Sequence, residues 1–172
     1  MTIGRRRALL TASTAGAATI LAGCSSSQYP GPDGDWDRLD DGDLLLAVPK
    51  GWDRSVAQSS IWGTKWTDPS DKSGVLMTAQ SVEAKDAYQA LNLAMNGARA
   101  VTRGYEPIGS RTAITNGTII LAQQQYQITW PYQKKGSLWA ISRDSQICLV
   151  DFSGAKITDK QIATVGQWIE LR

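Results

Sequence analysis

The sequence predicts an α+β domain over residues 44–172, in which a mostly antiparallel sheet is flanked by a long mid-chain helix and a C-terminal helix. Two observations predict this class. Short apolar runs bounded by turn residues occur before and after the middle of the chain, whereas one long central segment has the 3.6-residue period of a helix. Because strands and helices are grouped rather than strictly alternating, the pattern favours α+β over a parallel α/β sheet.

The first half of the domain reads as strands. The apolar run at residues 44–48 is closed by Pro49-Lys50-Gly51, which is typical of a buried strand and a turn. Residues 55–66 surround Gly63 and predict a pair of strands. A polar loop at residues 68–74 precedes a further strand at residues 75–79.

The mid-chain helix is predicted at residues 84–101, because apolar side chains recur there on one helical face. Gly104 follows this segment, as expected of a helix stop. The residues of the stripe are Ala84, Ala87, Tyr88, Leu91, Met95, Ala98 and Val101.

The second half returns to strand patterns. Residues 118–130 alternate between an apolar face that includes Tyr126 and Trp130 and a polar face of glutamines and a threonine. Residues 134–136 predict a turn, and residues 138–142 and 147–152 predict a hairpin. Thr158 and Gln161 form a capping box that begins the C-terminal helix.

The N-terminal 24 residues predict an export signal. Arg5, Arg6 and Arg7 form a basic head, and residues 8–22 are apolar but interrupted by threonine, serine and glycine. A membrane-spanning helix needs about 20 strongly apolar residues, which this segment lacks. A charged head, a short apolar middle and small residues before a cut site are typical of a cleaved signal.

Leu21-Ala22-Gly23-Cys24 resembles the lipobox of bacterial lipoproteins. This resemblance implies a signal peptide at residues 1–23 and a mature chain that begins with Cys24, which carries diacylglycerol and palmitate. It also implies a protein held on the extracytoplasmic face of the cell membrane. Arg6-Arg7-Ala8-Leu9-Leu10 is similar to a twin-arginine signal, although Arg5 stands where serine or threonine is usual, so the general export route stays open.

Residues 24–43 are interpreted as the lipidated cysteine followed by a flexible acidic tether, rich in serine, proline, glycine and aspartate. Asp33, Asp35 and Asp37 have the spacing of the first ligands of a calcium-binding EF-hand. Arg38 and Leu44 stand where that loop needs glycine and glutamate, which excludes it. Two interpretations of this acidic segment remain: a solvated spacer, or a weak and disordered site for divalent cations.

Composition limits the possible functions. Removing 23 of the 172 residues takes away three of the 18 basic residues, so 15 bases face 16 acids in the mature chain. This balance gives no indication of nucleic-acid binding or of electrostatic attraction to membranes. The chain has no histidine, which excludes Ser-His-Asp catalysis and removes the commonest zinc ligand. We expect no cofactor and no metal, and Cys148 is expected to be a buried apolar residue.

No residue pattern indicates catalysis, so we expect a protein that is not an enzyme. Ser153 and Lys156 have the spacing of a serine and its activating lysine, but the accompanying motifs of that family are missing or in the wrong order. Carboxylates are sparse, and no pair is singled out for glycoside hydrolysis. Asp151 falls within an apolar strand, where we interpret it as an edge-strand or turn residue.

Residues 46–52 read Leu-Ala-Val-Pro-Lys-Gly-Trp, and the Val-Pro-x-Gly-Trp turn resembles the start of LpqN-type lipoproteins, an actinobacterial family with a PsbP-like α/β/α sandwich. The order of the elements is similar to that fold over residues 44–172. The resemblance implies a non-enzymatic accessory or binding domain of the cell envelope, with no catalytic residues to transfer.

Seven tryptophans stand against a single phenylalanine. Trp52, Trp139 and Trp168 are expected in the core. A groove for an apolar or glycan ligand is predicted at four aromatic residues beside polar strand ends: Trp62, Trp66, Trp130 and Tyr132. The main hypothesis is an accessory domain for an envelope protein, and the alternative is a carrier or sensor of such a small ligand.

Overall fold

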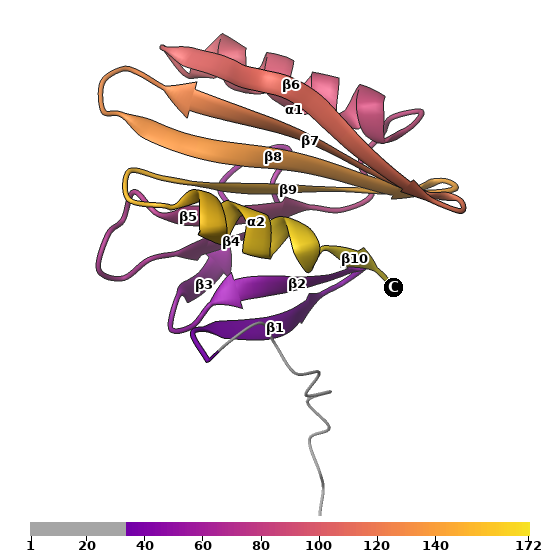
Figure 1. Ribbon diagram of the computed structural model, residues 1–172, viewed down its shortest axis with the longest axis horizontal. Coiled ribbons are helices and arrows are strands. Elements are labelled where there is room, and N and C mark those ends of the chain that lie inside the picture. The colour runs from indigo at the N-terminus through magenta and orange to yellow at the C-terminus, as the bar shows by residue number, and fades with distance from the viewer. Residues whose placement is uncertain (1–33) are drawn as a thin grey trace, which may run out of the picture.

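The computed structural model describes residues 34–172, which form two antiparallel sheets and two helices (Figure 1). The larger sheet has the strand order β3-β4-β5-β9-β8-β7-β6, and the smaller sheet has the order β1-β2-β10. In chain order the elements are β1 (Trp36–Asp41), β2 (Leu44–Pro49), β3 (Asp53–Val56), β4 (Thr64–Thr67), β5 (Val75–Ala79), α1 (Ala87–Val101), β6 (Tyr105–Asn116), β7 (Ile119–Ile128), β8 (Lys134–Arg143), β9 (Gln146–Gly154), α2 (Asp159–Gln167) and β10 (Glu170–Leu171).

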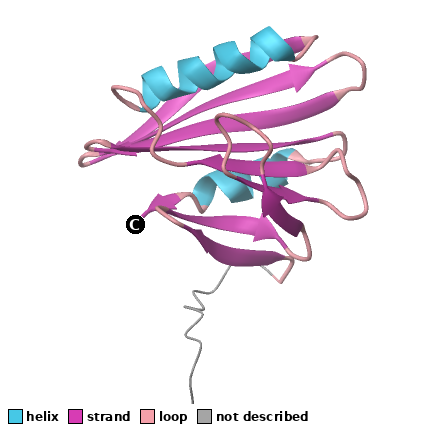
Figure 2. Ribbon diagram, turned by 180° about the vertical axis from the view of Figure 1, so that it is seen from behind, coloured by secondary structure: helices cyan, strands magenta, loops and turns pink. Residues whose placement is uncertain are grey.

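The larger sheet is buried on both faces over its central strands. Helix α1 covers one face, and α2 together with the smaller sheet covers the other (Figures 1 and 2). Side chains alternate along a strand, so β9 contributes to two cores: Leu149 packs under α1, whereas Cys148 and Val150 pack on the opposite side. Cys148 is buried and free, in agreement with its predicted role.

Helix α1 begins after Asp86, whose carboxylate accepts a hydrogen bond of 2.8 Å from the backbone N–H of Gln89. The helix ends at Val101, and Gly104 lies just beyond it with a φ of +75°. A Cβ atom on Gly104 would lie 2.8 Å from the backbone nitrogen of Trp130, so only glycine fits there. The predicted helix is confirmed, with a start three residues later.

Helix α2 has the predicted capping box. Thr158 accepts a hydrogen bond from the backbone of Gln161, and Gln161 accepts one from the backbone of Thr158. Ile162 and Val165 on its inner face are buried in the core shared with the smaller sheet. The prediction of this helix is confirmed.

The domain starts earlier than predicted, because residues 36–41 of the predicted tether form strand β1. Trp36 pairs with Pro49 and Asp41 with Leu44, so β1 lies along the whole of β2. Trp36 and Leu39 pack against the core. The boundary at residues 43 and 44 was therefore wrong: the acid-rich composition concealed a strand whose apolar side chains are few and only partly buried.

Asp41, the last residue of β1, has several hydrogen-bond partners. Asp41 is buried and accepts hydrogen bonds from Arg54 at 2.6 Å, Thr64 at 3.0 Å and the Thr78 hydroxyl. The Gln80 side chain donates to the Asp41 carbonyl at 2.5 Å. Since Thr64 and Thr78 belong to the larger sheet, this network joins the two sheets.

Two further strand predictions needed correction. Strand β6 was not predicted, because its exposed edge position imposes no apolar alternation. Residues 134–136, predicted as a turn, are the first residues of β8, and Tyr126 pairs with Gly136.

The predicted signal peptide, Cys24 and the tether up to residue 33 lie outside the described residues. Within residues 34–172, no helix combines the length and the apolar character that crossing a membrane requires.

Candidate binding site between helix α1 and the sheet

A cavity of about 650 Å³ lies between the C-terminal half of α1, the loop at residues 57–63 and the larger sheet. Helix α1 contributes small side chains to the wall, among them Ala94, Gly97 and Ala98. The loop contributes Ile61 and Trp62. Small residues on the helix leave a space that larger side chains would fill.

The loop that forms the outer wall is held in place by its own hydrogen bonds. The Ser59 hydroxyl accepts bonds of 3.1 Å and 3.3 Å from the backbone N–H groups of Ile61 and Trp62. The backbone of Gly63 donates to Thr78 in β5 at 2.9 Å and accepts from Ala57 at 3.0 Å. These bonds direct Trp62 toward the α1 side of the sheet, where it packs against that core.

The floor of the cavity is polar. Asp151 lies in β9, the central strand of the larger sheet, and is 6% exposed. The Tyr126 hydroxyl donates a hydrogen bond of 2.7 Å to its carboxylate, the single such bond that the described residues provide. The prediction that Asp151 is an edge-strand or turn residue was therefore wrong, because strands pair with β9 on both sides.

Gly136 makes the contact between Tyr126 and Asp151 possible. It lies opposite Tyr126 on β8, and a Cβ atom there would lie 2.5 Å from Tyr126 Cζ and 2.8 Å from Ser153 Cβ. The missing side chain lets the tyrosine ring cross β8 and reach β9.

Tyr105 supplies a second hydroxyl to the cavity lining. Its ring stacks on that of Tyr126, with 4.7 Å between the centroids. The Tyr105 hydroxyl oxygen is buried, and no hydrogen-bond partner for it exists within residues 34–172. A buried polar group without a partner costs about 1–3 kcal/mol, so it indicates a place for a ligand atom or a water molecule.

Burial dominates the electrostatics of the floor. It raises the pKa of Asp151 to about 7, although the Tyr126 hydrogen bond and the Lys134 charge oppose this rise. Burial, aided by the Asp151 charge, raises the pKa of Tyr105 to about 12 and that of Tyr126 well above its usual value. At neutral pH the floor thus offers neutral hydroxyl donors beside a carboxyl group that gains or loses a proton readily.

The structure places three of the four aromatic residues predicted to bind a ligand in two adjoining hollows. Trp62 lines the cavity. Trp130 and Tyr132, which are 52% and 75% exposed, line an adjoining hollow of about 370 Å³ with Pro131 between them. The hollow and the cavity share the side chains of Val101, Thr102, Ile128 and Lys134.

The prediction for Trp66 was wrong. It is 1% exposed and belongs to the core on the opposite face of the sheet, beneath the Arg54 guanidinium at 5.5 Å from its ring. The reason is the alternation of β4: Lys65 faces the cavity, so Trp66 must face away from it.

Sequence reasoning missed the floor because three separate strands form it. Tyr126 was placed on the correct, apolar face of its strand, and Asp151 was noted as unusual. Tyr105 lies at the start of the unpredicted β6. Only the register between these strands brings the three side chains together, and a single sequence does not reveal that register.

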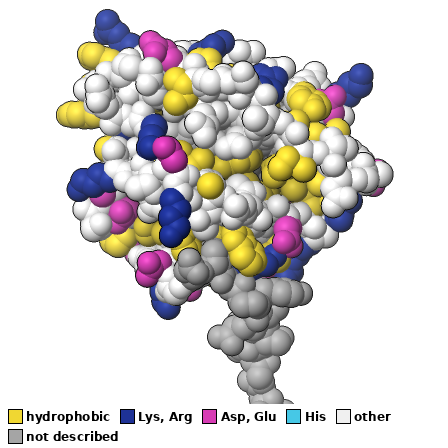
Figure 3. Space-filling view, viewed as in Figure 1, with side chains coloured by type: hydrophobic (Ala, Val, Ile, Leu, Met, Phe, Trp, Pro, Cys, Tyr) yellow, Lys and Arg dark blue, Asp and Glu magenta, His cyan; other side chains and the backbone are white. Residues whose placement is uncertain are grey.

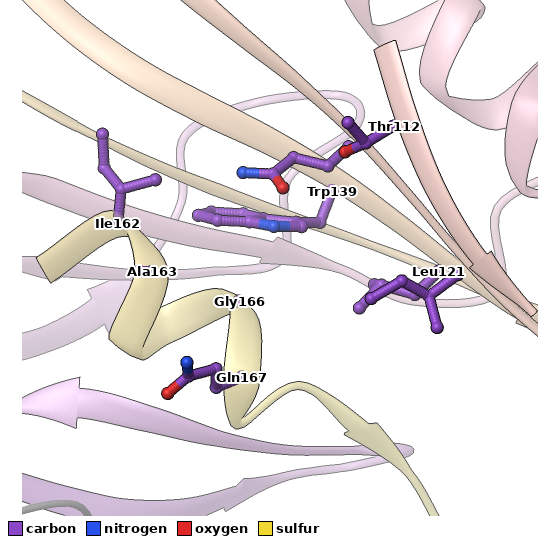
Figure 4. A pocket seen from close by; sticks show the side chains of 9 residues that line it. Thr112, Leu121, Trp139, Ile162, Ala163, Gly166 and Gln167 are labelled. Atoms are coloured by element: carbon purple, nitrogen blue, oxygen red, sulfur yellow. The ribbon is translucent and has the colours of Figure 1, made fainter. Parts of the chain in front are cut away.

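A smaller groove of about 240 Å³ lies on the other face of the sheet, beside α2 (Figure 4). Trp139 lies against Gly166 of α2, where a Cβ atom would be 2.9 Å from the indole nitrogen. Figure 3 shows apolar side chains at the surface of the face that carries α2. The residues described as lining this groove include no titratable side chain, so the groove carries no charge of its own.

Metal coordination has no evident place in the described part of the chain. Residues 34–172 contain no group of three or more histidine, cysteine, aspartate or glutamate side chains arranged to hold an ion. The cavity lining includes a single carboxylate, that of Asp151, within the same range.

Comparison with solved structures identifies the fold. The solution structure of cyanobacterial PsbP (CyanoP) from Synechocystis sp. PCC 6803 is 14% identical, with a TM-score of 0.66 over 88% of this chain and 99% of that chain. The protein therefore has a PsbP-like fold, as its sequence predicted. A crystal structure from Bacteroides thetaiotaomicron VPI-5482 is 14% identical, with a TM-score of 0.49 over 76% of this chain and 45% of the other. A protein of unknown function from Pseudomonas aeruginosa is 13% identical, with a TM-score of 0.40 over 72% of this chain and 85% of that chain.

No protein-family profile and no curated protein matches the sequence.

Proposed function

We propose that the protein is a non-enzymatic binding domain, anchored by lipid on Cys24 at the extracytoplasmic face of the cell membrane, that holds a small ligand between α1 and the sheet. The observation that carries the proposal is the cavity of about 650 Å³, with Trp62 in its wall and Asp151 in its floor. Binding sites of this kind combine apolar walls with a few placed polar groups.

The ligand is expected to be small and partly apolar, and a glycan fits the same description. Trp62 offers a flat apolar surface, and Trp130 and Tyr132 extend this surface at the adjoining hollow. The floor offers the Tyr105 hydroxyl as a donor and the Asp151 carboxyl group as an acceptor. A ligand hydroxyl group would satisfy both, because it donates and accepts hydrogen bonds.

A hydrolase is less well supported by this geometry. Glycoside hydrolysis uses two carboxyl groups that flank the bond, and the described lining of the cavity supplies one. Asp151 is therefore better placed to bind a group than to share in acid–base chemistry.

An accessory domain for an envelope protein is the second candidate function. The apolar groove beside α2 favours it, because a protein segment could occupy this groove while the cavity stays free. The two functions do not exclude one another, since the groove and the cavity lie on opposite faces of the sheet.

Ligand retention tests the proposed cavity. Ala98→Phe should fill it, since Ala98 lines the wall. We expect at least a roughly tenfold loss of co-purifying small molecule, which corresponds to about 1.4 kcal/mol. Protein isolated from membranes would be extracted with solvent, and the extract quantified by mass spectrometry.

Leu93→Phe is the matched control, because Leu93 lies on the same helix, is about half exposed and does not line the cavity. This variant should retain the ligand. Equal loss or equal retention in the two variants would refute the assignment of the cavity.

The lipid anchor has a separate test at Cys24. The isolated protein should start at this residue and carry a diacylglyceryl adduct, and Cys24→Ser should abolish both the adduct and the processing. Intact-mass measurement reports both features. Cys148→Ala, which changes the buried cysteine, should leave them unchanged. A native chain with residues upstream of Cys24 and no lipid would overturn the proposed anchoring.

A further inference from the structure

Exposed apolar side chains gather where α1 ends and the loop between β7 and β8 begins. Val101 is 86% exposed, and Trp130 and Tyr132 extend from the neighbouring loop. Large apolar side chains clustered in this way indicate an interaction surface rather than ordinary surface composition. We call this surface the aromatic rim and define it as Val101, Arg103, Trp130, Tyr132 and Lys134.

The rim also carries positive charge. The Arg103 guanidinium lies 4.5 Å from the centroid of the Trp130 ring, and Lys134 lines the same hollow. The described lining of this hollow contains no acidic side chain. Among the described residues, Asp71, in the loop at residues 68–74, and Asp151, which is buried in the cavity floor, interact electrostatically with Lys134.

This combination matches the chemistry of a bilayer surface. Tryptophan and tyrosine are enriched at the level of the lipid headgroups, where their rings are partly apolar and partly solvated. Arginine and lysine are attracted to anionic headgroups, by about 1 kcal/mol for each residue near the surface. The mature chain has almost no net charge, so such attraction depends on the local grouping of Arg103 and Lys134 rather than on the whole protein.

We propose that the aromatic rim docks onto the surface of an anionic bilayer. Arg103 and Lys134 bind headgroup phosphates, and Trp130 and Tyr132 insert at the headgroup level. The inference goes beyond the proposed function, because a ligand-binding domain on a lipid anchor need not touch the membrane. Since the rim and the cavity share Val101 and Lys134, docking places the mouth of the cavity at the leaflet.

Fluorescence quenching by brominated lipids tests the docking with the full protein as isolated from membranes. On phosphatidylglycerol vesicles the wild-type protein should be quenched, and Trp130→Phe should remove most of this quenching. On phosphatidylcholine vesicles both proteins should be quenched weakly. High salt should weaken the quenching on phosphatidylglycerol.

Charge-reversal variants provide a second test of docking in the same quenching experiment. Arg103→Glu with Lys134→Glu should lower the ratio of docked to free domain about thirtyfold or more. Lys50→Glu with Lys160→Glu makes the same change in net charge at exposed positions outside the rim and should have little effect. Equal quenching of wild type and Trp130→Phe, or no dependence on anionic lipid, would overturn the proposal, and the latter result would favour a protein partner for the rim. Ligand retention is measured separately, so failure here leaves the proposed cavity function standing.

Discussion

Asp41→Ala is expected to lower the free energy of unfolding by about 2–4 kcal/mol. Asp41 is buried between the two sheets and accepts hydrogen bonds from Arg54, Thr64 and Thr78. Removing the carboxylate leaves two threonine hydroxyls without their acceptor and one arginine without its partner. Each buried hydroxyl that loses its acceptor costs about 1–3 kcal/mol, whereas the Arg54 side chain is 57% exposed and adds little. Urea denaturation at neutral pH measures the change.

Asp40→Ala is the matched control in the same strand. Asp40 pairs with Arg172 at the surface, where both side chains are about half exposed. Exposed ion pairs contribute about 0–1 kcal/mol, so this variant should be close to the wild type. Equal effects of the two substitutions would contradict the assignment of β1 to the folded domain and would return residues 36–41 to the tether.

Asp151→Asn is expected to stabilise the protein by about 4 kcal/mol at pH 8 and to have little effect at pH 4. Burial raises the pKa of Asp151 to about 7 in the folded protein, against an ordinary value of 3.8. The folded state therefore binds the proton more tightly than the unfolded state. Wild-type stability should rise as the pH falls from about 8 to about 4, because the buried charge is then neutralised.

Asparagine removes this charge while keeping an acceptor for the Tyr126 hydroxyl. The pH dependence that arises from residue 151 should disappear from the variant, and urea denaturation at the two pH values compares the proteins. Asp53→Asn, at an exposed position in β3, serves as the control and should behave like the wild type. Identical pH profiles of wild type and Asp151→Asn would show that Asp151 is solvated rather than buried.

The destabilising carboxyl group is an argument for function. A buried acid with a shifted pKa in a cavity is typical of sites that bind or react. A ligand that donates a hydrogen bond to Asp151 would favour its charged form and lower its pKa. Ligand binding should therefore oppose the destabilisation that Asp151 causes at neutral pH.

The sequence was sufficient for much of the fold because burial imposes clear patterns. Strand β2 was predicted as a continuous apolar run, β5 as a strand after the polar loop, and β7 by its alternation of apolar side chains and glutamines. An apolar stripe identified α1, and a capping box identified α2. The resemblance of residues 46–52 to LpqN-type lipoproteins led to the PsbP-like fold that the comparison with CyanoP then showed.

The remaining elements depend on long-range pairing. Strand β1 was missed because two of its aspartates, Asp41 and Asp40, find partners outside the strand, in Arg54 and Arg172. Trp62 and Trp66 looked equivalent in sequence, yet Trp62 lies in a loop whose hydrogen bonds direct it to the α1 side, whereas the alternation of β4 places Trp66 in the opposite core. The floor of the cavity required the register of three strands, which no local pattern encodes.

The central claim, that the cavity beneath α1 binds a ligand, is tested most directly by a crystal structure of the protein isolated from its own membranes. We expect electron density for a small molecule beside Trp62, with a polar group in contact with Asp151 and the Tyr105 hydroxyl. Density for ordered water alone, at a resolution that distinguishes water from an organic molecule, would contradict the claim.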